Sequence, residues 1–197
     1  LIRAKTGIVF QNPDAQFVGA TVADDIAFGL ENKQVPHNEM DQIIKTYARK
    51  TGVDNLLDKT PDNLSGGQKQ KVALAGILAM LPDLIVFDEA LAMLDASSKK
   101  EINDLIDEIK KDHPNLTIIR ITHDLDETFN RSRVVVLSNG KIIADDKPIN
   151  IFTNQEILQL AKLDQPFIVK INQALKEMGL IDEANYSLHQ LAKVLCK

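Results

Sequence analysis

Cysteine and tryptophan are almost absent from this sequence. Its 197 residues include one cysteine, Cys196, and no tryptophan. A single cysteine can form neither an intrachain disulfide nor a metal–thiolate cluster, which is typical of proteins of the reducing cytosol. The longest apolar run extends only from Val72 to Leu81, whereas a membrane-spanning helix needs about 20 apolar residues. If the protein serves a membrane, we expect it to do so from outside the lipid.

The sequence also lacks an excess of basic residues. Lysine and arginine number 23 against 28 aspartate and glutamate residues, which gives a formal net charge of −5. A protein that binds nucleic acid usually carries a basic field, so no nucleic-acid partner is predicted. The 44% hydrophobic and 26% charged residues are typical of an ordinary globular protein.

Short, nearly continuous apolar runs recur along the chain. Because their hydrophobicity is continuous rather than alternating, we expect strands of a mostly parallel sheet that is buried on both faces. These runs are Gly7–Phe10, Leu84–Phe87, Thr117–Ile121 and Val134–Leu137. Helical patterns separate most of them, which predicts an α/β fold.

The helical patterns carry recognisable start and stop signals. Thr21 and Asp24 have the spacing of a capping box. Asn38 is expected to cap a second helix that ends at Gly52. A third, amphipathic helix is predicted from Ser97 to Lys111.

The pattern changes in the last third of the chain. Asn139-Gly140 between two apolar runs predicts a β-hairpin, and after Pro148 only helical patterns remain. We therefore predict one domain over residues 1–153, with a helical part at about 20–80, and a helical extension over 154–197. The helices expected in the extension are Asn154–Leu163, Phe167–Met178 and Ser187–Leu195.

Two glycines open one of the predicted helices, in the segment Ser65-Gly66-Gly67-Gln68. A helix N-terminus presents unpaired N–H groups and a positive dipole end, and glycines allow a phosphate to approach the backbone closely. The same four residues also fit a simple capping box, with Ser65 as the cap and Gln68 in the third position. The tetrapeptide alone does not choose between the two interpretations.

Two carboxylates, Asp88 and Glu89, directly follow the apolar run Leu84–Phe87. They are expected at the carboxyl edge of the sheet, where ligands of open α/β sheets bind. A carboxylate in that position can hold Mg²⁺, and its neighbour can orient or deprotonate a water molecule.

These two segments together resemble the ABC-type ATPases. Leu64–Ala75 is similar to their signature motif, and Leu84–Glu89 is similar to the Walker B motif that follows it across one helix. The resemblance implies part of a P-loop NTPase domain, with a mostly parallel sheet, a helical signature subdomain and a C-terminal helical extension. It also implies binding and hydrolysis of ATP with Mg²⁺, with Asp88 at the metal and Glu89 as general base. Ser65, Gly66, Gly67 and Gln68 would then contact the ATP bound to a partner subunit.

The resemblance assigns roles to three further residues. His123 is similar to the switch histidine that contacts the γ-phosphate, although a histidine at a strand end is more often structural. Asp95 resembles the D-loop aspartate, which communicates across the ATPase dimer. Gln11 resembles the Q-loop glutamine, which touches Mg²⁺ and faces the membrane partner. Asp124 and Glu127 are expected only to cap the helix that follows.

The surroundings of Gln11 narrow the resemblance to the ATPases of energy-coupling factor (ECF) transporters. The segments that carry it are Phe10–Phe17 and Thr21–Asn32. These transporters import vitamins and trace metal ions in prokaryotes. The resemblance implies a second ABC ATPase subunit, identical or related, a transmembrane coupling protein and a substrate-binding membrane protein. It further implies a peripheral location at the cytoplasmic face of the cell membrane, and dimerisation through the C-terminal extension.

The sequence departs from the family in two places. It contains no Gly-x-x-x-x-Gly-Lys-[Ser/Thr] loop, the P-loop that holds the phosphates. Because a strand pattern begins within a few residues of Leu1, we expect a fragment rather than a degenerate protein, and little ATP hydrolysis by the chain alone. Leu91 and Ala96 stand where the family usually has Thr and Pro.

Two alternatives to a transporter motor remain open. One is a non-catalytic subunit that offers only its signature motif to a partner. The other is a soluble ABC ATPase of DNA repair, chromosome maintenance or translation. Such ATPases usually carry coiled-coil or zinc-binding insertions, whereas the stretch from Gln11 to Leu64 has neither heptads nor cysteines.

Overall fold

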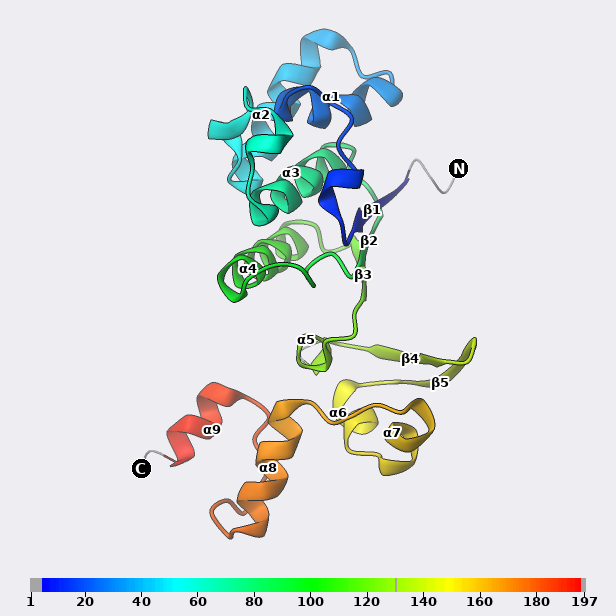
Figure 1. Cartoon of the computed structure of the whole chain (residues 1–197), viewed down its shortest axis with the longest axis vertical. Coiled ribbons are helices and arrows are strands. Elements are labelled where there is room, and N and C mark those ends of the chain that lie inside the picture. The colour runs from blue at the N-terminus through cyan, green and yellow to red at the C-terminus, as the bar shows by residue number, and fades with distance from the viewer. Residues whose placement is uncertain (1–4, 130, 196–197) are drawn as a thin grey trace. The chain divides into compact units, whose positions relative to one another are not determined.

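The computed structural model describes residues 5–129 and 131–195, so Leu1 and Cys196 lie outside the described residues. The chain divides into two compact units, Leu1–Ile121 and Thr122–Lys197. Figure 1 gives the course of the chain through the helices and strands of each unit.

Within the described residues, the first unit contains a parallel sheet of three strands. They are β1 (Thr6–Phe10), β2 (Leu84–Asp88) and β3 (Thr117–Ile121), in the order β1-β2-β3. The register aligns their carboxyl ends, because Phe10 lies opposite Asp88 and Asp88 lies opposite Ile121. The chain segments that leave the three strands therefore start from one edge of the sheet.

Helices α3 (Gly66–Ala79) and α4 (Ala96–Asp112) supply the core beside this sheet (Figure 1). Val9 and Ile85 are buried in that core, 1% exposed each. The prediction of burial on both faces is wrong for the described residues. Successive side chains alternate between the faces, and Ile8 and Ile119, on the other face, are 42% and 46% exposed.

A helical subdomain forms a second core in the same unit. Helices α1 (Val22–Asn32) and α2 (His37–Thr51) pack against α3, with short 3₁₀ turns η2 (Pro13–Ala15), η3 (Asp54–Leu56) and η4 (Pro61–Asn63) between elements. The capping box of Thr21 and Asp24 is confirmed. The predicted cap at Asn38 is wrong: α2 begins at His37, and Pro36, with an extended ψ of 135°, is the N-cap residue without a side-chain hydrogen bond.

The second unit joins a β-hairpin to the C-terminal helices. The hairpin pairs β4 (Val134–Ser138) with β5 (Lys141–Asp146) through Asn139 and Gly140, both at positive φ, as predicted. Val136 of the hairpin shares one core with Phe152 and Val169. The unit therefore starts before residue 154, where the extension was expected. Its helices are α5 (Leu125–Phe129), α6 (Pro148–Phe152), α7 (Gln155–Ala161), α8 (Phe167–Glu177) and α9 (Leu188–Leu195).

None of the helices in residues 5–129 and 131–195 combines the length and the apolar character needed to cross a membrane.

Candidate functional site

The carboxyl edge of the sheet carries three of the predicted site residues. Gln11 directly follows β1, Asp88 ends β2, and Glu89 directly follows it. The pairing of Phe10 with Asp88 brings the ends of β1 and β2 side by side. This edge is where ligands of open α/β sheets bind.

Glu89 has a strained backbone. Its φ of 50° lies in the left-handed region, which residues with a side chain avoid. Its N–H donates to the Ile121 carbonyl at 2.9 Å, and its own carbonyl accepts the Ala92 N–H at 3.0 Å. Such strain costs about 1–3 kcal/mol and concentrates at functional sites, where it fixes the direction of a side chain. The conformation of Glu89 is thus consistent with the predicted role.

The loop that carries Gln11 is closed by a second amide side chain, Gln16. Its Nε2 donates to the Ile8 carbonyl at 3.0 Å, and its Oε1 accepts the Phe10 N–H at 2.9 Å. Gln16 thereby satisfies two backbone groups on the edge of β1 away from β2. The sequence does not predict this contact, because nothing local shows that an amide six positions beyond Phe10 returns to the strand.

The segment Ser65-Gly66-Gly67-Gln68 forms a capping box, which was one of the two interpretations of its sequence. Ser65 N–H donates to Gln68 Oε1 at 2.9 Å, and Gln68 N–H donates to Ser65 Oγ at 3.3 Å. Gly66 and Gly67 then occupy the first turn of α3, whose N–H groups have no acceptor within the helix. The capping box is compatible with phosphate binding, because its two hydrogen bonds use the N–H groups of Ser65 and Gln68 and not those of Gly66 and Gly67.

Gly67 also has a structural reason to be glycine. A Cβ at this position would lie 2.9 Å from Ser98 Oγ and 3.1 Å from Ser98 Cβ. The start of α3 therefore lies against the first turn of α4, which the sequence pattern did not indicate.

Asp95 is the N-cap of α4. Its carboxylate accepts the N–H groups of Ser97 and Ser98, both at 3.0 Å, and the Ser98 hydroxyl at 2.7 Å. The Ser98 hydroxyl, followed by the Ser98 N–H, holds the pKa of Asp95 below its ordinary value. Because Ser98 also lies against Gly67, the structure links the predicted D-loop residue to the signature glycines.

His123 belongs to the second unit and is exposed there. The neighbouring Thr122 hydroxyl accepts the Asp124 N–H at 2.9 Å, and Asp124 accepts the Asp126 N–H at 3.1 Å. Asp124 thus holds the start of α5, as predicted, whereas the role of His123 stays a prediction.

The carboxyl edge of the sheet has the donor atoms that a nucleotide-bound Mg²⁺ requires. No group of three or more Asp, Glu, His or Cys side chains that could hold a metal occurs in the described part of the chain. Mg²⁺ needs no such cage beside a nucleotide, since one or two carboxylates, phosphate oxygens and waters are the usual ligands. Asp88, with Gln11 on the adjacent strand end, fits that arrangement.

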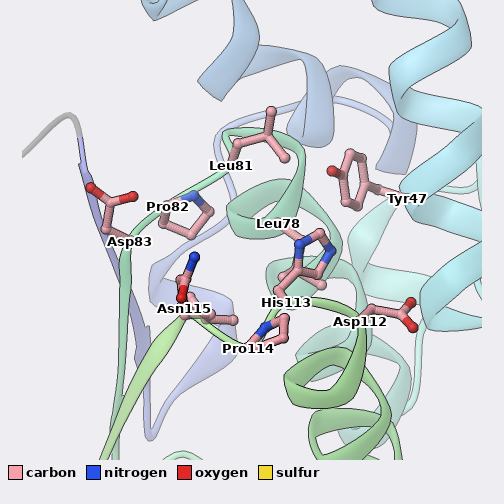
Figure 2. Close-up of a pocket in the computed structure, with 10 residues that line it drawn as sticks. Tyr47, Leu78, Leu81, Pro82, Asp83, Asp112, His113, Pro114 and Asn115 are labelled. Carbon is pink, nitrogen blue, oxygen red and sulfur yellow. The ribbon is translucent and has the colours of Figure 1, made fainter.

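A cleft of about 360 Å³ lies away from these residues, in the first unit (Figure 2). Tyr47 and His113 line it, together with Asp83, which precedes β2, and Asp112. It therefore lies at the amino ends of the strands, opposite the carboxyl edge. Asp83 pairs with Lys5 at 2.7 Å and Asp112 with Lys50 at 3.3 Å, so both carboxylates already have partners. This cleft is not the candidate site.

Comparison with protein families places this geometry in a known class. Residues 1–92 match the family model described as "ABC transporter". The fold, with Asp88 and Glu89 at the carboxyl edge of a parallel sheet, agrees with this match and with the class of ABC-type ATPases.

Individual relatives make the assignment narrower. The chain is 47% identical over 196 residues to "Energy-coupling factor transporter ATP-binding protein EcfA1" of Mycoplasma mobile, a match of 100% of this chain and 70% of that protein. It is 51% identical over 180 residues to the protein of that name in Lactobacillus delbrueckii subsp. bulgaricus, covering 91% of this chain and 64% of the relative. The chain belongs to the family of ATP-binding proteins of energy-coupling factor transporters.

A solved structure agrees with this assignment. The cbiO1 protein of Clostridium perfringens, described as part of the ABC transporter complex cbiONQ, superposes with a TM-score of 0.72 at 35% identity. The match covers 90% of this chain and 66% of that one. The chain thus spans about two thirds of the length of these three proteins.

Proposed function

We propose that this chain provides the hydrolytic and signature elements of the ATPase that drives an energy-coupling factor importer. The observation that carries the proposal is the strained Glu89 directly after Asp88, at the carboxyl edge of a parallel sheet. The family membership of the chain supports the same conclusion.

Hydrolysis of ATP requires a water molecule to attack the γ-phosphate in line with the leaving group. In our proposal Glu89 accepts a proton from that water, and Gln11 and His123 contact the region of the γ-phosphate. Asp88 would hold Mg²⁺, which neutralises charge on the phosphate oxygens when it is bound. Asp88 ends β2, and Gln11 and Glu89 directly follow β1 and β2, so the strands fix the backbones of these three residues.

The signature residues act on a second nucleotide in this proposal. The first turn of α3 would direct the N–H groups of Gly66 and Gly67 at the phosphates of ATP bound to a partner subunit, with Ser65 and Gln68 ordering the turn. The positive end of the helix dipole favours such an anion. Asp95, at the start of α4, would take part in communication between the two subunits.

We propose three kinds of partner. They are a second ATP-binding subunit, identical or related, a transmembrane coupling protein and a membrane protein that binds the vitamin or metal ion. Dimerisation would use the C-terminal helices over 154–197. The ATPase would lie at the cytoplasmic face of the cell membrane, held there by these partners.

The test is Glu89→Gln in the whole subunit, assembled with its partners in membranes. ATP turnover is expected to fall by about 10²–10⁴-fold, the usual contribution of a general base, while ATP still binds. Glu108→Gln, the same change at an exposed position of α4, is the matched control. Turnover that is equal in the two variants would remove Glu89 from the proposal. Absence of turnover in the unmodified complex would favour a non-catalytic subunit.

A further inference from the structure

Gln70 is buried in the second turn of α3, 3% exposed, and its side chain bridges two distant segments. Its Nε2 donates to the Phe10 carbonyl at 3.1 Å and to the Ala90 carbonyl at 2.8 Å. Both protons of one amide group are therefore used, one for each segment.

The two acceptors are next to candidate site residues. Phe10 immediately precedes Gln11, and Ala90 immediately follows Glu89. The signature helix is thus hydrogen-bonded, through one planar group, to the backbone on which the Q-loop glutamine and the candidate base depend.

The other end of the same amide argues against a role in packing alone. Gln70 Oε1 is buried and has no hydrogen-bond partner among the described residues. A buried acceptor without a partner destabilises a fold, and an apolar side chain of similar length would avoid that cost. The amide differs from an apolar side chain in its two N–H donors, which bind the Phe10 and Ala90 carbonyls.

A second contact ties the residue before Gln70 to the Q-loop. Lys69 forms an ion pair with Asp14 in η2, and its side chain is only 14% exposed. The end of β1 at Phe10 and the following loop at Asp14 are therefore both attached to α3.

We propose that Gln70 is a positioning residue that couples the signature helix to both Gln11 and Glu89. This rests on the proposed function, since the coupling concerns the residues assigned to hydrolysis. When α3 shifts as its first turn meets a partner's nucleotide, the amide of Gln70 carries that shift to the backbone at Phe10 and Ala90. A site with the wrong position of α3 would then have Gln11 and Glu89 out of place.

The experiment replaces Gln70 in the whole subunit, in its assembled complex. Gln70→Met keeps the length of the side chain and removes both N–H donors of the amide. Gln70→Glu keeps the shape of the side chain and also removes both donors. Gln42 is exposed on α2, so Gln42→Met and Gln42→Glu are the matched controls. The readouts are kcat and KM for ATP, and the hydrogen exchange of the backbone amides from Gln11 to Gln16 and from Glu89 to Leu94.

For both Gln70 variants we expect kcat to fall by about 10- to 100-fold, the range for misplaced catalytic groups, with KM changed by less than about threefold. Amide exchange should become faster in the two named segments and stay unchanged in α1. Either kcat and exchange equal to those of the Gln42 controls, or loss of a cooperative thermal transition in both variants, would overturn the proposal. If the unmodified complex hydrolyses no ATP but exchange still accelerates, the proposed function fails and the coupling stands.

Discussion

Gly7 offers a sharp test of how β1 packs on α3. The residue lies in β1, on the side of the sheet that faces the helix, and an added Cβ would lie 2.1 Å from Cγ2 of Ile77. The same atom would lie 3.2 Å and 3.3 Å from Cβ and Cγ1 of Ile77. The Gly7→Ala variant therefore has to push the strand and the helix apart or force Ile77 out of its rotamer.

The expected destabilisation combines two opposing effects. Because Gly7 does not have a positive φ, alanine fits the backbone and restricts the unfolded chain, which by itself stabilises by about 0.4–1 kcal/mol. Overpacking of a well-filled core costs about 1–3 kcal/mol, and the contact here is shorter than any real Cβ contact. We therefore expect a net loss of about 1–2 kcal/mol, the overpacking cost less the backbone gain.

Urea unfolding followed by circular dichroism measures this loss. With an m-value of about 2 kcal/mol/M, the midpoint should fall by about 0.5–1 M. The Ile77→Leu change removes the branched methyl group that meets the new Cβ, so the double variant should recover most of the loss. The Ile77→Val change keeps a methyl group at that position and should give no recovery. A midpoint that is unchanged in Gly7→Ala, or recovered equally by both second changes, would refute this packing.

Two further predictions concern other parts of the chain. The pKa of Asp95 is lowered by its hydrogen bonds, so its contribution to stability is present above the unfolded pKa of about 3.9 and is lost as the pH falls through the lower folded value. In acid titrations of thermal stability, Asp95→Asn should therefore flatten the decline below about pH 4. Asn172 is 2% exposed and exchanges two hydrogen bonds with the backbone of Asn185, so Asn172→Leu should cost about 1–3 kcal/mol and speed amide exchange at Asn185. A change of less than about 0.5 kcal/mol, the range of ordinary surface substitutions, would show that this pair does not hold α8 to the loop.

Local sequence signals predicted much of the element structure. Three of the four continuous apolar runs form the described strands of the parallel sheet, whereas the fourth, Val134–Leu137, lies in a separate antiparallel sheet. Asn139-Gly140 predicted the hairpin of that second sheet, because a tight two-residue turn requires positive φ. The capping boxes at Thr21 and Ser65 were also readable, since a cap depends only on residues within one helical turn. The expected cap at Asn38 was one of the errors, since α2 already begins at His37.

The sequence by itself also determined which residues are candidates for chemistry. Asp88 and Glu89 follow an apolar strand, and a parallel strand has to present its carboxyl end at the edge where ligands bind. Together with Ser65-Gly66-Gly67-Gln68, they carry the resemblance of the sequence to the ABC-type ATPases.

Only the tertiary structure decided how these residues are held. The contact of Gly67 with Ser98, the return of Gln16 to β1 and the bridge from Gln70 to Phe10 and Ala90 join segments that lie up to 60 residues apart. The periodicity of a sequence does not predict such contacts, because it reflects the geometry of a single helix or strand and not the way that these elements pack on one another. The strained φ of Glu89 has the same origin, since the neighbouring strand fixes its N–H through the Ile121 carbonyl. The sequence therefore determined which groups are available, and the packing of α3 against the sheet decided which of them act together.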